Sequence, residues 1–129
     1  MTRTRKILLA EDDPTVCDLI EEFLGDMSVI IVVTTTRAAT RKALAENSDF
    51  DLILIDFWLA DGDATEVLDY LKEAHAGTPV IAMSGSDGPI DLERTEAITE
   101  LSGSTIFMQK PLSRETLRQK VEQSLNKTS

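Results

Sequence analysis

Acidic, hydroxyl and lysine side chains follow the apolar runs of this sequence. The run Leu52–Ile55 leads directly into Asp56, while Ser84 and Lys110 lie close behind two later runs. A carboxylate is almost never fully buried unless it is paired or bound to a metal. The recurrence of such residues after apolar runs therefore indicates a functional site. Three acidic residues follow the first apolar run: Glu11, Asp12 and Asp13.

The types of these residues fit the chemistry of a phosphoryl group. Close carboxylates repel one another unless a cation intervenes, and Mg²⁺ is typically held by one or two carboxylates, waters and a phosphate oxygen. Lys110 is a compact cation suited to an anion, and the Ser84 hydroxyl can donate a hydrogen bond to that anion. Gly85 allows close backbone approach. We therefore predict a phosphoryl site with Asp56 as the possible nucleophile, since aspartyl phosphates are an established covalent strategy.

Each of these features also has an ordinary structural role. Two aspartates before Pro14 are typical of a helix cap, and the pair Ser84 and Gly85 is typical of a turn. A lysine before a proline is commonly a solvated loop residue. The prediction of a site comes from the occurrence of all these residues at the ends of successive strands.

Short apolar runs alternate with amphipathic stretches along the chain. The apolar runs are rich in Ile, Leu and Val with little alternation, which is typical of strands covered on both faces. Five such strands alternating with helices predict an α/β fold with a doubly wound parallel sheet. Ligands of these sheets bind outside the carboxyl ends of the strands, where the acidic residues converge if the first and third strands are neighbours. The predicted strands are Lys6–Ala10, Val29–Thr34, Asp51–Ile55, Pro79–Met83 and Thr105–Met108.

Five stretches are predicted to form helices. The first begins at Asp13 and Pro14 and ends near Gly25, and Thr36 is the predicted cap of the second. An apolar stripe from residue 64 to residue 71 marks the third, and the last begins near Ser113. The fourth is predicted over residues 91–101, where the apolar stripe has gaps.

The composition fits one globular domain. The 129 residues are 42% apolar and carry a formal net charge of −10. This charge disfavours binding to nucleic acid or anionic lipid and favours cationic partners and divalent metals. No apolar stretch approaches the length of a membrane helix or a signal-peptide core. The single cysteine, Cys17, excludes an internal disulfide and fits a reducing, cytoplasmic environment.

Four stretches of the sequence together resemble the receiver domain of two-component response regulators. They are ILLAEDDP, DLILIDFWLADGD, VIAMSG and IFMQKP, in this order and at compatible intervals, and the resemblance covers essentially the whole chain. It implies a flavodoxin-like sheet of order 2-1-3-4-5 with five helices. It further implies a phosphorelay protein that takes a phosphoryl group from a histidine kinase or phosphotransfer protein and acts on a downstream protein target.

The resemblance assigns the expected phosphoacceptor and metal ligands. Asp56 aligns with the phosphoacceptor. Asp12 and Asp13 align with the acidic pair that holds Mg²⁺ together with Asp56. The backbone carbonyl of Trp58 is expected to be a further ligand.

The remaining matches concern the phosphoryl group and the response to it. Lys110 aligns with the lysine that pairs with the phosphoryl group, and its bond to Pro111 is expected to be cis. Ser84 aligns with the hydroxyl residue that turns toward the phosphoryl group, with Gly85 behind it. Phe107 aligns with the aromatic residue that changes rotamer in concert with Ser84.

Three residues depart from the family pattern behind Asp56. Ala60 stands where proline is usual, and Ala64 stands where glycine is usual. We therefore expect a looser or differently shaped loop with the site intact. Trp58 is bulky beside the phosphoryl position, and we expect it to hinder the attacking water and to alter the lifetime of the phosphoryl group.

Several functional alternatives follow from the sequence. Only NKTS follows the last helix, so we expect a single receiver domain over residues 1–129 without an output domain. Phosphorelay, a phosphate sink and direct binding of a target stay open. A pseudo-receiver that binds partners without phosphorylation is one rival. The other is a phosphohydrolase of the haloacid-dehalogenase type, because DGDAT matches its nucleophile motif, although that motif should follow a buried strand directly. The favoured interpretation is a signalling protein that catalyses only its own phosphorylation and dephosphorylation.

Overall fold

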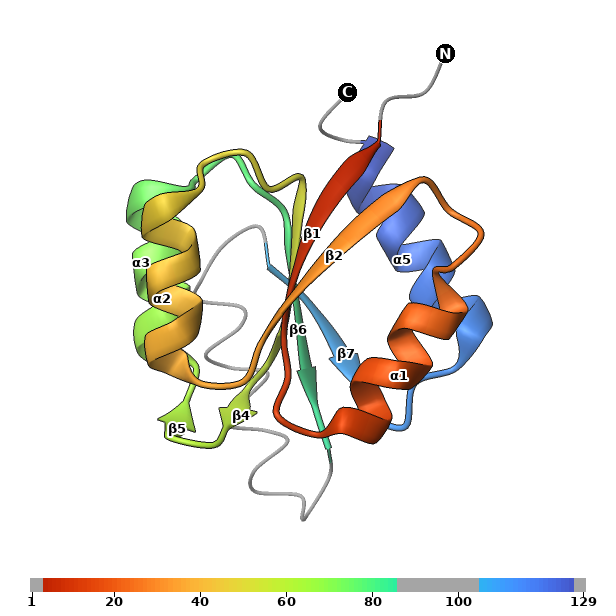
Figure 1. The fold of residues 1–129 in the computed structure, drawn as a ribbon, viewed down its shortest axis with the longest axis horizontal. Coiled ribbons are helices and arrows are strands. Elements are labelled where there is room, and N and C mark those ends of the chain that lie inside the picture. The colour runs from red at the N-terminus through yellow and green to blue at the C-terminus, as the bar shows by residue number, and fades with distance from the viewer. Residues whose placement is uncertain (1–3, 86–104, 127–129) are drawn as a thin grey trace.

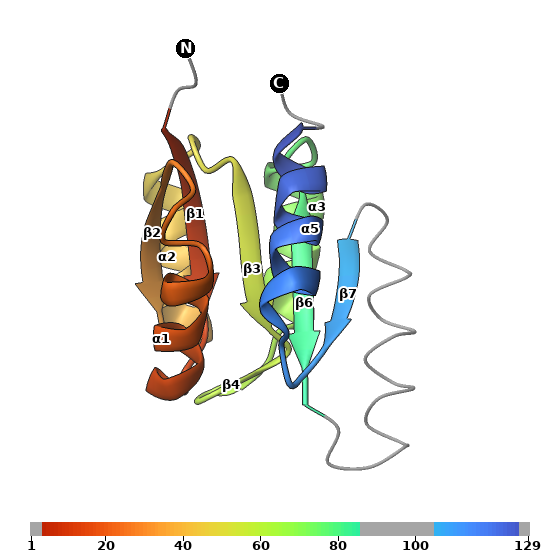
Figure 2. The ribbon, with the colours of Figure 1, turned by 90° about the vertical axis from the view of Figure 1, so that its right-hand side faces the viewer.

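The main sheet consists of five parallel strands, which a computed structural model describes together with the rest of residues 4–85 and 105–126. The strand order β2-β1-β3-β6-β7 is the predicted order 2-1-3-4-5 when these five are counted along the chain (Figure 1, Figure 2). The predicted doubly wound, flavodoxin-like sheet is therefore confirmed. The bounds are Arg5–Ala10 for β1, Val29–Thr34 for β2, Leu52–Asp56 for β3, Val80–Ser84 for β6 and Thr105–Gln109 for β7.

Two pairs of helices cover the sheet. α1 (Pro14–Phe23) and α5 (Arg114–Asn126) lie on one face, and α2 (Arg37–Glu46) and α3 (Thr65–Ala74) lie on the other (Figure 1). Four of the five predicted helices are thereby confirmed. The fourth, predicted over residues 91–101, lies outside the described residues. In the described part of the chain, no helix is both long and apolar enough to cross a membrane.

A separate apolar core lies on each face of the sheet. Leu8 and Ile53 belong to the core beneath α2 and α3, whereas Leu9 and Leu54 belong to the core beneath α1 and α5. Burying each such side chain contributes roughly 1.5–3 kcal/mol. Because adjacent residues of one strand are buried on opposite faces, the strands read as continuous apolar runs.

Side-chain caps begin three of the helices. Asp13, Thr36 and Ser113 cap α1, α2 and α5, and their side-chain oxygens accept backbone N–H groups at 2.9, 3.0 and 3.1 Å. Such caps satisfy donors that have no partner within the helix. The helix starts predicted from these residues are therefore correct to within one residue.

Three strands extend one residue beyond their predicted ends. β3, β6 and β7 end at Asp56, Ser84 and Gln109, each of which is polar. Asp56 still pairs with Met83, and Ser84 still pairs with Gln109, in the parallel ladder. Hydropathy misses these ends because the ladder is formed by the backbone and does not depend on the polarity of the side chain.

A short hairpin follows β3 and was not predicted from the sequence. β4 (Trp58–Leu59) and β5 (Gly62–Asp63) pair in the antiparallel direction, so the connection to α3 has its own hydrogen-bonded structure. Strands of two residues carry no periodicity that a sequence pattern can reveal. Gly62 adopts a φ of +136°, a region that favours glycine.

Candidate functional site

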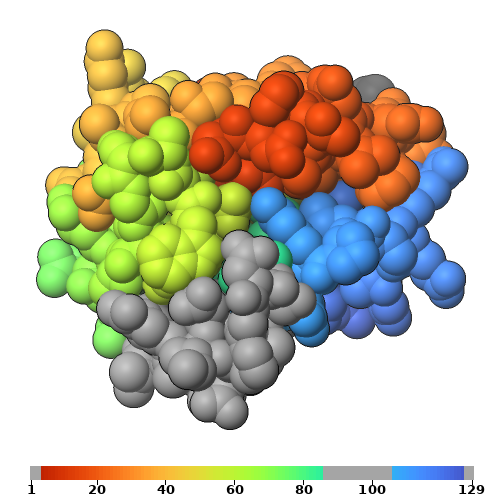
Figure 3. Space-filling model, turned by 90° about the horizontal axis from the view of Figure 1, so that it is seen from below, coloured from red at the N-terminus to blue at the C-terminus, as the bar shows by residue number. Residues whose placement is uncertain are grey.

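Carboxylates meet at the end of the molecule where the parallel strands terminate. Glu11 and Asp12 follow β1, Asp56 ends the neighbouring strand β3, and ligand oxygens of the three lie within 4.8 Å of one another. Figure 3 looks onto this end, where the start of α1, the β4–β5 hairpin and the connection from β7 to α5 come together. The pairing of β1 with β3 therefore produces the convergence expected from the sequence.

Glu11 is a fully buried member of this group. Its Oε2 accepts the backbone N–H groups of Asp12 at 3.0 Å and Asp13 at 3.4 Å, and its Oε1 accepts a hydrogen bond from Lys110 Nζ at 2.5 Å. Burial raises the pKa of the Glu11 carboxyl, and Asp56 adds to this rise while Lys110 opposes it. Sequence reasoning noted Glu11 behind the first strand but did not assign it to the metal site.

Lys110 bridges the two buried carboxylates. Its Nζ lies 2.5 Å from Glu11 Oε1 and 3.3 Å from Asp56 Oδ2. Burial acts to lower the pKa of Lys110, but the hydrogen bond to Glu11 and the charge of Asp56 outweigh it, so the pKa is raised. The Lys110 N–H donates to the carbonyl of Ser84 at 2.8 Å, which ties the lysine to β6. The peptide bond between Lys110 and Pro111 is cis, as expected.

Asp56 lies at the boundary between the core and the surface. The residue is only 6% exposed, and its Oδ1 accepts the Trp58 N–H at 3.2 Å. Trp58 itself is 39% exposed, and its ring packs edge-on against Phe57 at a centroid distance of 5.2 Å. One carboxylate oxygen therefore faces Lys110, and the other faces the beginning of the β4–β5 hairpin.

Asp13, which the sequence predicts as a metal ligand, lies outside the group of Glu11, Asp12 and Asp56. Its side chain is exposed, and its Oδ1 accepts the Thr15 N–H at the start of α1. Consecutive residues point in different directions, so three acidic residues in a row do not all reach one point. The structure brings Glu11, and not Asp13, together with Asp12 and Asp56.

Ser84 and Phe107 lie on β6 and β7, and Gly85 directly follows β6. Ser84 is fully buried at the end of β6, and its hydroxyl donates to the Gly85 carbonyl at 3.2 Å. Phe107 is half-buried on β7 and pairs with Ala82. A Cβ added at Gly85 meets no heavy atom within 4 Å among the described residues. The space beside Gly85 is therefore open among the described residues, and the close approach of its backbone to an anion stays a prediction.

The residues of the DGDAT segment serve structural roles. Asp61 accepts the backbone N–H of Arg37 at 2.6 Å, and Asp63 Oδ1 accepts the backbone N–H of Thr65 at the start of α3. The segment runs from the hairpin into α3, with β4 between it and the buried strand β3. The geometry therefore gives no support to the phosphohydrolase alternative.

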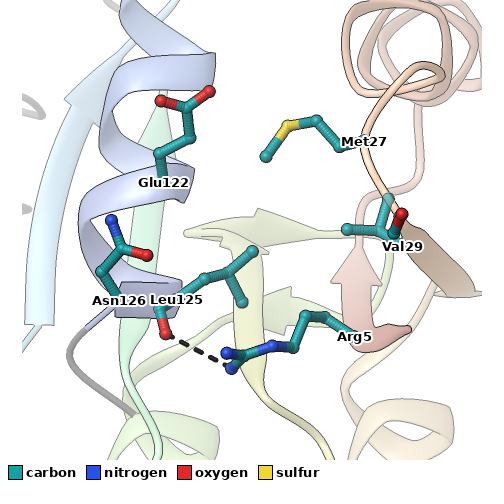
Figure 4. Close-up of a pocket in the computed structure, with 7 residues that line it drawn as sticks. Arg5, Met27, Val29, Glu122, Leu125 and Asn126 are labelled. Atoms are coloured by element: carbon teal, nitrogen blue, oxygen red, sulfur yellow. Dashed lines mark hydrogen bonds between the residues drawn. The ribbon is translucent and has the colours of Figure 1, made fainter. Parts of the chain in front are cut away.

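Surface pockets lie at both ends of the sheet. A pocket of about 370 Å³ borders Glu11 and Asp12, and an apolar pocket of about 400 Å³ lies beside Lys110. A third, of about 380 Å³, lies at the opposite end, between Arg5 at the start of β1 and Glu122 near the end of α5 (Figure 4). There Arg5 Nη1 donates to the Leu125 carbonyl at 3.3 Å. Only the first two pockets adjoin the carboxylate group.

The chemistry of the donor set fits a hard divalent cation. Glu11, Asp12 and Asp56 offer carboxylate oxygens, which Mg²⁺ prefers as ligands. With all three ionised, one lysine neutralises one charge, and two negative charges remain. A divalent ion held by these carboxylates would balance the two charges.

Comparisons with known proteins point to one family. A family model described as the response regulator receiver domain matches residues 7–122. The response regulator protein PilR of Pseudomonas aeruginosa is 33% identical over 94% of this chain, and the cell cycle transcriptional regulator CtrA of Caulobacter vibrioides is 33% identical over 87%. The chain spans 26% and 46% of the length of these two relatives.

A solved structure shows the same similarity in three dimensions. The receiver domain of the Francisella response regulator 1452 superposes with a TM-score of 0.79 at 25% identity. The superposition covers 97% of this chain and 99% of that chain. The similarity therefore extends over the sheet, the helices and the edge at which the carboxylates gather.

Proposed function

We propose, from the premise that this chain belongs to the response regulator receiver domain family, that Asp56 accepts a phosphoryl group in an Mg²⁺-dependent reaction. The observation that carries the proposal is that Lys110 lies between the buried carboxylates of Glu11 and Asp56. These two carboxylates form a group with that of Asp12. Receiver domains act in signalling together with histidine kinases. An acyl phosphate on Asp56 is the chemical form that such a signal takes.

The reaction transfers phosphorus from nitrogen to oxygen. An Asp56 oxygen attacks the phosphorus of a phosphohistidine, a P–O bond forms as the P–N bond breaks, and the imidazole leaves with a proton from water. Bound Mg²⁺ supplies charge neutralisation for the phosphoryl oxygens. Lys110 reaches toward the Asp56 oxygen at which the phosphoryl group arrives, so its charge is already in place.

We assign the metal ligands from the geometry. Glu11, Asp12 and Asp56 supply carboxylate oxygens, and the carbonyl of Trp58 is proposed as the backbone ligand. Lys110 exchanges part of its contact with Glu11 for the phosphoryl oxygens. This exchange is reasonable because a lysine ammonium has three donors on a flexible stem.

The response to phosphorylation is proposed to run through β6 and β7. The Ser84 hydroxyl, which donates to the Gly85 carbonyl, turns to the phosphoryl group, and the half-buried Phe107 changes rotamer with it. Ser84 pairs with Gln109 at the end of β7, and the Ser84 carbonyl accepts the N–H of Lys110, the next residue. A change at Ser84 therefore reaches the strand that carries Phe107.

The apolar pocket beside Lys110 is proposed to receive the phosphodonor. Val16, Leu19, Pro111 and Leu112 line it, and Leu19 is 40% exposed. Because Lys110 borders this pocket and also contacts Asp56, a partner seated there brings a histidine within reach of the acceptor. An apolar helix face that carries the phosphohistidine fits such a surface.

Labelling with a small phosphodonor tests the proposal. Wild-type protein incubated with Mg²⁺ and acetyl phosphate or phosphoramidate should gain one phosphoryl group by intact-mass spectrometry, and Asp56→Asn should gain none. Removing Mg²⁺ with a chelator should abolish labelling. A folded wild type that binds Mg²⁺ but stays unlabelled would contradict the proposal and favour a pseudo-receiver.

A further inference from the structure

The β4–β5 hairpin is attached to the start of α2 by Arg37 and Asp61, which we call the Arg37–Asp61 clamp. The Arg37 guanidinium donates through Nη2 to the Asp61 carbonyl at 2.7 Å and through Nη1 to the Asp63 carbonyl at 3.5 Å. It also lies against Gly62, where an added Cβ would come within 2.8 Å of Arg37 Cζ. One planar side chain thus contacts the backbone of three consecutive hairpin residues.

Asp61 makes the return contact from the hairpin to the helix. Its Oδ1 accepts the Arg37 N–H at 2.6 Å, and its Oδ2 accepts the Ala38 N–H at 3.3 Å. These N–H groups belong to the first turn of α2, where backbone donors have no partner within the helix. The clamp therefore consists of two side chains, each of which is hydrogen-bonded to the backbone of the segment that carries the other.

The clamped hairpin carries Trp58 beside the phosphoacceptor. Trp58 pairs with Asp63 across the hairpin, and its N–H donates to Asp56 Oδ1 at 3.2 Å. At the other end, the Ala64 N–H donates to the Phe57 carbonyl at 2.8 Å. The carbonyl that we assign to the metal belongs to the peptide group between Trp58 and Leu59. Both of these residues are paired in the hairpin, so the position of the hairpin sets the direction of that carbonyl.

The hairpin is too short to hold this position by itself. Even complete isolated hairpins are at best marginally stable in water, and these strands have two residues each. The hydrogen bonds of Arg37 and Asp61, which join the hairpin to the start of α2, add a restraint from outside the hairpin. A ligand that is fixed before the metal arrives costs less ordering entropy on binding, which increases affinity.

We propose that Arg37 and Asp61 are positioning residues for the metal and phosphoryl site, through the orientation of Trp58. This inference rests on the proposed function, because it takes the Trp58 carbonyl as a metal ligand. It makes the start of α2 and the turn of the hairpin a second region that sets Mg²⁺ affinity, although neither residue belongs to the carboxylate group.

The test is a Mg²⁺ titration that uses Trp58, the only tryptophan of the chain, as the fluorescent reporter. Arg37→Ala removes the guanidinium and should weaken Mg²⁺ binding about tenfold, at the lower end of the effect of mutating residues that orient metal ligands. Arg37→Lys keeps the charge but cannot reach both carbonyls, so it should restore only part of the affinity. Calorimetric titration provides the same constant without the reporter.

Glu66→Gln provides the matched control. Glu66 Oε1 pairs with Arg41 Nη1 at 2.7 Å, which also joins α2 to the start of α3 but does not contact the hairpin. Its loss should leave Mg²⁺ affinity unchanged. In metal-free Arg37→Ala, backbone amides of β4 and β5 should exchange hydrogen faster than in wild type, while those of β1 and β3 should not.

The outcomes separate this inference from the proposed function. Wild type without any Mg²⁺ response would overturn both. Wild type that binds Mg²⁺, with Arg37→Ala binding equally well, would overturn the inference alone. An equal loss in Arg37→Ala and Glu66→Gln would also overturn it, since the effect would then follow from general loosening of α2 and α3.

Discussion

At the scale of single residues, the three consecutive acidic residues after β1 have different contacts and different roles. Glu11 is buried and hydrogen-bonded to Lys110, Asp12 lies with it in the carboxylate group, and Asp13 caps α1. The three are consecutive in sequence and chemically similar. Only their positions relative to the end of β1 distinguish the residues that we propose as metal ligands from the helix cap.

This division predicts opposite effects for two substitutions. Glu11→Gln removes a carboxylate from the group and should weaken Mg²⁺ binding by more than about tenfold. Asp13→Ala removes only a cap and should leave Mg²⁺ affinity unchanged, while lowering stability by about 1 kcal/mol. Mg²⁺ titration and thermal unfolding of both variants measure the two effects. Lost affinity in Asp13→Ala with normal affinity in Glu11→Gln would restore the assignment expected from the sequence.

At the scale of elements, the connection from β3 to α3 departs most from what the sequence predicts. Ala60 and Ala64 led us to expect a looser or differently shaped loop, and the structure contains a hairpin held by Arg37. Ala64 is fully buried, and its N–H bonds back to Phe57. Local propensity does not specify the conformation of this connection. Its conformation depends on contacts from α2, which is distant in the sequence.

The hairpin also predicts a dependence of stability on pH. The pKa of the Asp61 carboxyl lies below its ordinary value of 3.8. The main cause is the hydrogen bond from the Arg37 N–H, and the Ala38 N–H adds a smaller lowering, which burial partly opposes. A lowered pKa stabilises the folded protein above the unfolded-state pKa, and this contribution is lost as the pH falls through the folded-state pKa. Asp61→Asn should therefore be less stable than wild type at pH 7, with the difference shrinking below about pH 3.8.

Chemical unfolding at several pH values measures this difference. Arg37→Ala is the informative control, because it keeps the backbone N–H that contributes most to the lowered pKa. It should retain most of the pH dependence while losing stability at every pH. A difference between wild type and Asp61→Asn that is the same at pH 3 and pH 7 would contradict the role given to the Asp61 charge.

At the scale of the whole molecule, the chain is acidic, and one edge of its sheet is formed by an apolar strand. β2 is an edge strand with the uncharged sequence VIIVVT, and Ile30 and Val33 are 56% and 39% exposed (Figure 2). Ser28 and Thr34 direct their carbonyls to β1, so the alternate residues Ile31 and Val33 direct their backbone groups to the open edge. Natural edges are usually protected by charge or proline, and this one has neither.

The net charge of −10 is the remaining protection against association through this edge. We expect weak self-association that increases with salt, because salt screens the repulsion between copies. Val33→Lys should suppress it, although the substitution reduces the magnitude of the net charge. Leu19→Lys changes the charge equally at a side chain of similar exposure on α1 and should not suppress it.

Light scattering at increasing protein and salt concentrations measures this association. Equal behaviour of Val33→Lys and Leu19→Lys would show that the edge of β2 is not the contact. Absence of any association in wild type at high salt would contradict the prediction.

The sequence by itself determined the sheet, its α/β class and four described helices, because burial and capping follow from local patterns of apolar and polar residues. It also predicted the strand ends at which the candidate site residues lie, since Asp56, Ser84 and Lys110 each follow an apolar run. These features depend on periodicity and residue type, which are properties of the chain alone.

Only the tertiary structure decided which side chains share one point in space. It placed Glu11 rather than Asp13 beside Asp56, and it joined Arg37 to a hairpin more than twenty residues away in the sequence. Both outcomes depend on side-chain direction and on contacts between segments distant in sequence. Such contacts form only when the two cores bring the strands and helices together, so no local pattern encodes them.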